Sequence, residues 1–582
     1  MDDEVTTPDG LRLAVVQRGD RSGPTVVAVH GYPDDRHVWD GVADVLAGSG
    51  HHVVTYDVRG HGRSDSPPGR AGYDLELLAA DLRAVCDAVS PDRPVHLLAH
   101  DWGGCQAWHA VTGDALAGRV ASLTSISGPC LDHVGLFLRR RSPRDLPAVL
   151  RQALHSWYTL AFRLPVLPEL LWRSGTLPGA LVRRERVPRP STRDGLRGLE
   201  LYRRNMARGL GRPEPRHTGV PVQVLVPLRD AYVTPALAVS ATTFADDVAV
   251  RYLPGGHWVV RQRPELVARC VAEHVAAAEG DPGTEAPALR RARARGAALA
   301  AEGGRAGPAS RWSGALAVVT GAGSGIGRAT AQELADRGAR VVVVDLDPAG
   351  AAETAGAIAR RHGRHRAVAE ILDVADDAAV AALATRVATE HGVPDLVVNN
   401  AGIAVAGPFA DTGADEWRRI VDVNLWGVVH GCRHFGELMR SHGEGGHLVN
   451  VASAAAYLPS RVLPAYSTTK AAVLMLSECL RAELADDGIG VTALCPGFVN
   501  TPITTHARFA GADDAEQETR RRAAAAAYTR RGYSPERVAR RLLRAVEKNL
   551  PLAPVTAEAH AGLLASRLSP TLTRALARVE PR

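Results

Sequence analysis

Lysine is almost absent from this sequence. Its 69 basic residues include two lysines, Lys470 and Lys548, and the rest are arginines. Where arginine replaces lysine so widely, a retained lysine indicates a position that a guanidinium does not fill. The formal net charge of +6 is a mild excess, and no basic patch with interleaved aromatic residues occurs. This pattern argues against nucleic-acid binding.

Cysteine pairs and long apolar runs are also missing. The seven cysteines show no Cys-x-x-Cys pair and no metal-ligand spacing, so we expect buried thiols in a reducing compartment and no bound metal. No run of about 18 apolar residues occurs, so no transmembrane helix is predicted. Residues 1–4 are acidic, and no signal-peptide core follows them. We therefore expect a cytoplasmic protein, with at most peripheral contact to the inner face of the membrane.

The length of 582 residues is too great for one hydrophobic core and predicts two or three domains. An apolar content of 46% and a charged content of 23% are typical of globular proteins. Residues 279–311 are rich in alanine, glycine, proline and arginine and contain no aromatic side chain. They predict a partly helical linker, with the basic run at 290–295 exposed to solvent. The two domains are then residues 1–278 and 312–582.

Asp101 lies in the sequence His-Asp-Trp-Gly-Gly, between an apolar run at 95–99 and a helical segment at 105–111. A strand, a tight turn and a helix in this order form a nucleophile elbow. The residues two before and two after its apex, here Ala99 and Gly103, must be small. A carboxylate nucleophile forms an ester with an alkyl carbon. The substrate is therefore expected to be an epoxide or an alkyl halide rather than an ester.

Two further motifs precede this elbow. His-Gly-Tyr-Pro at 30–33 follows one apolar strand, and Asp-Val-Arg-Gly-His-Gly-Arg-Ser at 57–64 follows another. Strands alternating with helices predict a doubly wound α/β fold. The three motifs, in this order, resemble the epoxide hydrolase branch of the α/β-hydrolase family over residues 1–278. The resemblance implies an α/β-hydrolase fold with a helical lid at about 130–215.

The family's chain order of nucleophile, acid and histidine indicates Asp230 and His257 as partners of Asp101. Asp230 follows an apolar run, and His257 stands in Gly-Gly-His-Trp. We expect Asp101 to form an alkyl ester, and His257, oriented by Asp230, to activate the water that hydrolyses it. By resemblance, the backbone N–H groups of Tyr32 and Trp102 bind the oxyanion. The alternative interpretation is that Asp230 caps a turn and His257 is an ordinary loop residue.

The departing epoxide oxygen needs an acid, and epoxide hydrolases use two lid tyrosines for this step. Tyr158 and Tyr202 match these positions, although Glu200 stands where the family often has asparagine. Haloalkane dehalogenases share the aspartate and tryptophan of the elbow but lack the tyrosines. The resemblance therefore favours an epoxide hydrolase, with a dehalogenase as the alternative. In the other interpretation, both tyrosines only pack the lid helices and have no role in catalysis.

A glycine-rich turn opens the second domain. The apolar strand at 315–319 leads into Thr-Gly-Ala-Gly-Ser-Gly-Ile-Gly, which starts a helix. Glycines there allow a tight turn and close approach of a pyrophosphate to the helix N-terminus. Asp345 ends the next strand, where a carboxylate accepts the ribose hydroxyls and repels a 2′-phosphate, so NAD is expected rather than NADP. The cofactor contacts predicted in the turn are Gly321, Ser324, Gly325, Ile326 and Gly327.

Residues 312–582 resemble the short-chain dehydrogenase/reductase family, which implies a Rossmann-type doubly wound parallel sheet. Tyr466 and Lys470 form its Tyr-x-x-x-Lys motif, Ser453 stands 13 residues before the tyrosine, and Asn424 is the fourth catalytic position. The resemblance also implies cofactor contacts at Asp373, Asn400, Pro496, Gly497, Val499 and Thr501, as well as at the motif tyrosine and lysine.

The spacing of Tyr466 and Lys470 has a physical reason. Residues four apart share one face of a helix. A phenol with a pKa of about 10 is a poor base at neutral pH, and a nearby ammonium is expected to lower that pKa. Ser453 would hold the substrate oxygen, and Asn424 would order a water beside the lysine. Arginine is a poor substitute for this lysine because it does not readily relay a proton.

The two resemblances together imply a bifunctional enzyme, which is similar to the fusions of actinobacteria. An epoxide hydrolase would make a vicinal diol, and an NAD-dependent dehydrogenase would act on a related alcohol or ketone, both with lipophilic small molecules. A homo-oligomer through the second domain is expected.

The helical tail from residue 550 is expected to pack on its own domain or on a dimer mate, with membrane contact as the alternative. A lipid-binding or scaffold role of the first domain is a second hypothesis, which the complete triad argues against.

Overall fold

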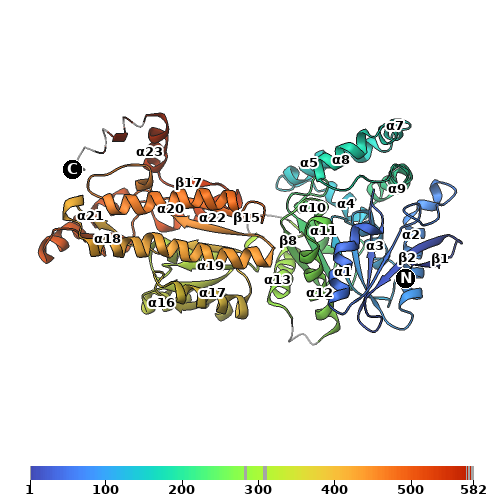
Figure 1. The fold of residues 1–582 in the computed structure, drawn as a ribbon, viewed down its shortest axis with the longest axis horizontal. Coiled ribbons are helices and arrows are strands. Elements are labelled where there is room, and N and C mark those ends of the chain that lie inside the picture. Colours follow the sequence, from blue (N-terminus) through green and yellow to red (C-terminus); the bar gives the residue numbers. More distant parts are fainter. Residues whose placement is uncertain are drawn as a thin grey trace. The chain divides into compact units, whose positions relative to one another are not determined.

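The computed structural model describes residues 2–280, 285–305, 311–569, 571, 573, 574 and 577. The chain divides into two compact units, Met1–Ser310 and Arg311–Arg582, which Figure 1 shows in blue to green and in yellow-green to red. Parts of the predicted linker, 281–284 and 306–310, lie outside the described residues.

An eight-stranded sheet forms the centre of the described part of the first unit, in the order β1-β2-β4-β3-β5-β6-β7-β8. The pairs β1–β2 and β2–β4 are antiparallel, and the remaining neighbours are parallel. Parallel strands covered on both faces are nearly continuous apolar runs, as the sequence showed for this region. The strands are β1 (Asp2–Thr6), β2 (Arg12–Arg18), β3 (Thr25–Val29), β4 (His52–Tyr56), β5 (Val95–His100), β6 (Val120–Ile126), β7 (Val222–Pro227) and β8 (Val248–Leu253).

Helices cover both faces of this sheet. Alternate side chains of β3 enter different apolar clusters: Val26 and Ala28 pack with α1 and α12, whereas Val27 and Val29 pack with α2 and α3. The helices that accompany the sheet are α1 (Asp40–Gly48), α2 (Leu75–Val89), α3 (Trp102–Val111), α10 (Pro235–Ser240), α11 (Val259–Gln262) and α12 (Pro264–Glu279).

Between β6 and β7 the chain leaves the sheet and forms a helical layer. This layer occupies the region where the lid is predicted, and Figure 1 shows α7 and α8 in teal at its outer rim. Its helices are α4 (Leu131–Leu138), α5 (Leu146–His155), α6 (Trp157–Ala161), α7 (Leu167–Arg173), α8 (Thr176–Glu185) and α9 (Thr192–Gly211).

The predicted linker contains a packed helix, α13 (Pro287–Ala301), which lies against β8. Leu289 and Leu299 are buried, and a Cβ on Gly296 would stand 1.8 Å from the carbonyl oxygen of Val248. The basic run is not wholly solvated, because Arg295 is buried and donates a hydrogen bond to the Val250 carbonyl. Small residues let the helix approach the strand closely. Alanine occupies exposed as well as buried positions of α13, so the buried face does not stand out in the sequence.

A seven-stranded parallel sheet forms the centre of the described part of the second unit, in the order β11-β10-β9-β12-β14-β15-β17. The order reverses between β9 and β12, which is the doubly wound Rossmann arrangement predicted for this half. The strands are β9 (Leu316–Thr320), β10 (Arg340–Asp345), β11 (Ala367–Ile371), β12 (Leu396–Asn399), β14 (Gly446–Val451), β15 (Ile489–Cys495) and β17 (Leu552–Pro554), and β13 (Val405–Ala406) pairs separately with β16 (Arg508–Phe509).

The helices of the second unit flank this sheet. They are α15 (Gly325–Asp336), α16 (Pro348–His362), α17 (Asp377–His391), α18 (Ala414–Val421), α19 (Gly427–His442), α20 (Pro464–Glu483), α21 (Asp514–Arg531), α22 (Pro535–Glu547) and α23 (Ala557–Leu568). In the predicted helical tail, α23 packs on its own unit through the buried Ala559, whose carbonyl accepts a hydrogen bond from Tyr457. Searched over the described residues, the helices include none with the length and hydropathy needed to cross a bilayer.

Candidate functional site

Asp101 stands at the turn between β5 and α3, where the sequence predicts a nucleophile elbow. Its φ of 52° and ψ of −123° are strained for a residue with a side chain. The turn is tight because the neighbouring backbone is close: a Cβ on Gly103 would lie 2.3 Å from the carbonyl oxygen of Val29. The Asp101 Oδ1 accepts a hydrogen bond of 2.7 Å from the backbone N–H of Tyr32. The carboxylate is thus held by the loop after β3.

Asp230 and His257 follow the neighbouring strands β7 and β8 and meet Asp101. The His257 Nδ1 lies 3.1 Å from Asp230 Oδ2, and its Nε2 lies 3.4 Å from Asp101 Oδ2. Asp230 is fixed in turn by the backbone N–H groups of Tyr232 and Val233, at 2.7 and 3.0 Å from its Oδ1. The structure therefore brings the three predicted residues together in the order that a hydrolytic triad requires.

The two carboxylates govern the ionisation of His257. Burial alone would lower the pKa of this histidine, but the charge of Asp230 and the hydrogen bonds to Asp101 and Asp230 raise it to about 10. Burial likewise opposes ionisation of Asp101, yet the hydrogen bond and charge of His257 bring the pKa of Asp101 below its ordinary value. An imidazolium between two carboxylates is the resting state of this arrangement.

Tyr158 of α6 and Tyr202 of α9 reach the same place from the lid. Their rings meet edge to face, with centroids 6.1 Å apart. Tyr202 packs on the ring of Trp102 at 4.9 Å, and Tyr158 packs on Tyr232, which contacts His257 at 4.8 Å. Burial, followed by neighbouring negative charge that includes Asp101, raises the pKa of both phenols well above the ordinary value. Both are therefore protonated donors.

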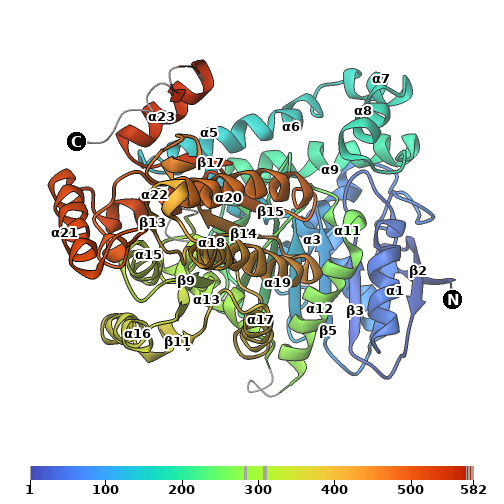
Figure 2. The same ribbon diagram turned by 60° about the vertical axis from the view of Figure 1, so that its left-hand side comes forward.

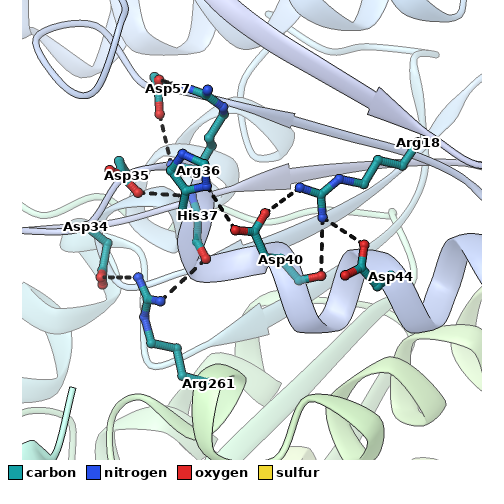
Figure 3. A network of polar contacts seen from close by, with 9 residues as sticks. All are labelled: Arg18, Asp34, Asp35, Arg36, His37, Asp40, Asp44, Asp57 and Arg261. Carbon is teal, nitrogen blue, oxygen red and sulfur yellow. Dashed lines mark hydrogen bonds and ion pairs between the residues drawn. The ribbon is translucent and has the colours of Figure 1, made fainter. Parts of the chain in front are cut away.

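A polar network that sequence reasoning missed joins the loops carrying Tyr32 and His257, and Figure 3 shows the part of it formed by Asp34, Arg261 and His37. Asp34 accepts a hydrogen bond from the indole N–H of Trp258 at 2.7 Å. It also forms an ion pair with Arg261 at 3.2 Å. Arg261 also donates to the backbone carbonyl of His37. The sequence offered one indication of this network, namely the position of its residues: Asp34 directly follows the His-Gly-Tyr-Pro motif, and Trp258 directly follows His257. The network fixes the backbone donor of Tyr32 relative to the histidine.

The second unit contains a cavity of about 1870 Å³ at the carboxyl ends of its strands. Most of the predicted cofactor and catalytic residues line it: Gly321, Ser324, Gly325, Ile326, Asp345, Asp373, Asn400, Ser453, Tyr466, Lys470, Pro496, Gly497, Val499 and Thr501. Gly327 lies behind the turn, where a Cβ would stand 2.1 Å from the Gly321 carbonyl oxygen. Sequence reasoning did not identify the part of the wall that α21 supplies, which includes Arg520, Ala524, Ala527 and Tyr528.

The glycine-rich turn fits a dinucleotide. Gly321 and Gly325 have φ values of 61° and 51°, so side chains there would strain the turn. A Cβ on Gly323 would lie 2.8 Å from Asp345 Oδ2, the same oxygen that accepts the Gly323 N–H at 2.7 Å. The turn and the carboxylate at the end of β10 thus form one cradle at the N-terminus of α15. These residues would hold the pyrophosphate and the adenosine ribose.

The predicted catalytic residues of the second unit lie around buried Lys470. Its Nζ donates to the Val451 carbonyl at 2.8 Å and lies 5.8 Å from the ring centre of Tyr466. Burial lowers the pKa of Lys470 to about 8. Asn424 lies in a π-helical turn at 422–426 and exchanges hydrogen bonds of 2.8 and 2.9 Å with the backbone of Ile403. A π-turn inside a helix is frequent at functional sites.

The expected lowering of the Tyr466 pKa by Lys470 is wrong for this structure. Burial raises the pKa of Tyr466 to about 12, although a hydrogen bond with Ser453 acts in the opposite direction. The lysine is held on a backbone carbonyl and does not offset the loss of solvent around the phenol.

Each of the two units matches a known protein family. Residues 24–188 match the model of the alpha/beta hydrolase fold, and residues 315–510 match that of the short chain dehydrogenases. The chain is 40% identical over 597 aligned residues, 99% of this chain and 98% of the relative, to "Probable oxidoreductase EphD" of Mycobacterium tuberculosis. This chain belongs to the family of hydrolase-fold and short chain dehydrogenase fusions.

The dehydrogenase half of the fusion also matches single-domain enzymes. Cis-4-hydroxycyclohexanecarboxylate dehydrogenase of Sinomonas cyclohexanicum is 41% identical over 191 residues, 32% of this chain and 74% of that protein. A solved short chain dehydrogenase/reductase of Burkholderia phymatum in complex with NAD is 29% identical, has a TM-score of 0.42, and corresponds to 47% of this chain and 98% of its own. The fusion is thus an enzyme with a hydrolase-fold domain and an oxidoreductase domain, and membership of the dehydrogenase family implies a nicotinamide cofactor.

The raised pKa of His257 predicts a pH-dependent stability of the first unit. The histidine stays protonated up to about pH 10 when folded but only to about pH 6.5 when unfolded. Its contribution is fully present below about pH 6.5 and is lost as the pH rises through about 10. Relative to His257→Gln, the free energy of unfolding should fall by up to about 1.4 kcal/mol per pH unit in this window.

Chemical unfolding at each pH, followed by tryptophan fluorescence, measures this difference. Six of the nine tryptophans lie in the first unit, so the signal reports mainly on it. Parallel pH profiles for the wild type and His257→Gln would contradict the raised pKa.

Proposed function

We propose that the first unit hydrolyses an epoxide to a vicinal diol through an alkyl ester on Asp101. The observation that carries the proposal is the pairing of a carboxylate at the elbow with two protonated phenols beside it, Tyr158 and Tyr202. The carboxylate attacks one epoxide carbon, the carbon–oxygen bond breaks, and a phenol gives its proton to the departing oxygen.

Ester formation prepares the second step. It removes the charge of Asp101 and the hydrogen bond that support the raised pKa of His257. The imidazolium therefore releases its proton, which returns to the tyrosinate left by the first step. The neutral His257, oriented by Asp230, then takes a proton from water as the water attacks the Asp101 carbonyl. The N–H of Tyr32, now 2.7 Å from Asp101 Oδ1, faces the oxyanion that forms there, and the N–H of Trp102 is proposed as the second donor.

For the second unit we propose NAD-dependent interconversion of an alcohol and a ketone. The bound nicotinamide would accept or supply the hydride. Tyr466 would exchange a proton with the substrate oxygen, Ser453 would hold that oxygen, and Lys470 would relay the proton through a water ordered beside Asn424. The carboxylate of Asp345 in the cofactor cradle supports NAD over NADP, because it would repel a 2′-phosphate.

Both sites are proposed to take lipophilic small molecules, with the diol of the first unit as a substrate of the second. The homo-oligomer expected through the second unit stays a prediction.

Trapping the ester tests the hydrolase proposal. The full chain carrying His257→Gln should form an ester with a long-chain terminal epoxide but not release it. Mass spectrometry should then show the added mass of one epoxide on Asp101. The double variant Asp101→Asn/His257→Gln is the matched control and should gain no mass. Adding Tyr158→Phe should slow adduct formation by about tenfold or more, because one acid is lost.

The alternative activity has its own outcome in the same experiment. An adduct with a haloalkane but none with the epoxide would make the first unit a dehalogenase. No adduct with either compound would overturn the role of Asp101.

The cofactor proposal predicts a change of preference in Asp345→Asn. Asparagine keeps an oxygen for the Gly323 N–H but loses the charge that repels a 2′-phosphate. The ratio of NADPH to NADH dissociation constants, measured by fluorescence titration, should fall by about tenfold. Glu370→Gln on the neighbouring strand β11 removes a similar charge outside the cavity and should leave the ratio unchanged. An unchanged ratio in Asp345→Asn would remove the argument for NAD.

Sequential action of the two sites predicts NADH formation from an epoxide. Wild-type enzyme given epoxide and NAD should raise the absorbance at the NADH wavelength, whereas Asp101→Asn and Tyr466→Phe should not. Supplying the diol directly should restore the signal in Asp101→Asn only. Diol accumulation without NADH in the wild type would show that the two units act on unrelated molecules.

A further inference from the structure

The lid exposes an unusual concentration of apolar side chains. Of the 20 large apolar side chains exposed among the described residues, nine lie between 146 and 170, each between 45% and 74% exposed. They come from α5, α6, α7 and the loop before α7, which follow one another in teal in Figure 2. We call them the lid patch: Leu146, Leu150, Leu154, Trp157, Leu160, Leu164, Val166, Leu167 and Leu170.

The helical spacing shows that the patch is a face rather than a scatter of residues. Leu146, Leu150 and Leu154 are four residues apart along α5 and therefore lie in one row. The opposite side of α5 carries the buried Val149 and Gln152, which contact the rest of the first unit. The helix thus has one side for its own core and a second apolar side that faces outward.

The surroundings of the lid patch are positively charged. Residues 139–190 contain eleven arginines and three acidic residues. The acidic groups do not neutralise the arginines in the stretch from α5 to α7. Asp145 pairs with Arg305, Glu169 pairs with Arg203, and Glu185 is buried.

Three exposed arginines lie in the stretch of chain from α5 to α7 that carries the lid patch. Among the described residues, Arg151, Arg163 and Arg173 have no ion-pair partner. An apolar face with unneutralised arginines is complementary to a surface that is apolar inside and anionic outside.

We propose that the lid patch binds the surface of a lipid bilayer that carries anionic head groups. Leucines would enter the boundary between head groups and acyl chains, and Trp157 would lie at the interface, where tryptophan is enriched. The arginines would remain at head-group level and attract the anionic lipid. Apolar surface of this extent on a monomer marks an interaction site rather than ordinary exposure.

This surface lies directly behind the first site. On α6, Trp157 and Leu160 face outward, whereas the ring of Tyr158 packs inward on Phe162 and Tyr202. A lid on the membrane would therefore place the proposed acid next to the source of a lipophilic epoxide, a consequence that rests on the proposed function. Binding to the bilayer does not rest on it.

Sedimentation with sucrose-loaded vesicles tests the proposal, using the full chain and no substrate. The protein should sediment with mixed phosphatidylcholine and phosphatidylglycerol vesicles and much less with phosphatidylcholine alone or at high salt. The variant Leu150→Ser/Leu154→Ser/Trp157→Ser should reduce partitioning by at least about tenfold. The variant Arg151→Gln/Arg163→Gln/Arg173→Gln should reduce it by about fivefold per arginine on the mixed vesicles.

The tail helix provides the matched control. Leu564 and Leu568 of α23 are also exposed leucines, and Leu564→Ser/Leu568→Ser should leave partitioning unchanged. Circular dichroism should show that every variant keeps its fold, because the replaced side chains are exposed. Absence of sedimentation, or a loss caused by the tail variant rather than the lid variant, would overturn the proposal. A concentration-dependent dimer in ultracentrifugation that the lid variant abolishes, without vesicle binding, would assign the patch to a second copy of the chain.

Discussion

The imidazole of His257, held between the carboxylates of Asp101 and Asp230, is the interaction on which the first unit depends. Two buried carboxylates so close together are costly unless a cation stands between them. His257 supplies that charge, which keeps Asp101 ionised. The loop after β3, whose Tyr32 N–H holds Asp101, is tied to the loop of His257 through Asp34, Trp258 and Arg261.

The second unit shifts the pKa values of Lys470 and Tyr466 without such an ion pair. Burial lowers the pKa of Lys470 to about 8 and raises that of Tyr466 to about 12. No carboxylate among the described residues offsets these shifts. Both sites lie at the carboxyl ends of parallel strands. Charged partners determine the pKa shift in the first site, whereas burial determines the shifts in the second.

The lid has an inner and an outer apolar side. Its inner side contributes Tyr158 and Tyr202 to a continuous series of ring contacts that ends on Trp102 of α3. Its outer side carries the lid patch. A short helix such as α6 serves both sides at once, since residues next to each other in sequence point in different directions. The chemistry of the site and the exposure of the lid are therefore coupled through the same few residues.

The sequence by itself determined what depends on local spacing. The elbow at Asp101, the glycine-rich turn and the Tyr-x-x-x-Lys pair were predictable because tight turns and helix faces demand particular residues at fixed separations. The α/β class of both units followed from apolar strands alternating with helices. Asp230 and His257 were predictable through family chain order, and the structure places His257 between Asp230 and Asp101.

Only the tertiary structure decided what depends on burial and on distant contacts. Asp34 and Arg261 are 227 residues apart, so no local sequence pattern predicts their ion pair. The pKa of Tyr466 rises because the folded chain removes solvent around it. In α13, alanine occupies both buried and exposed positions, so the sequence does not show which face is packed. The leucines of α5 have the spacing of a core helix, and only the fold shows that they face outward. Spacing is a property of the chain, whereas solvent exposure belongs to the folded molecule.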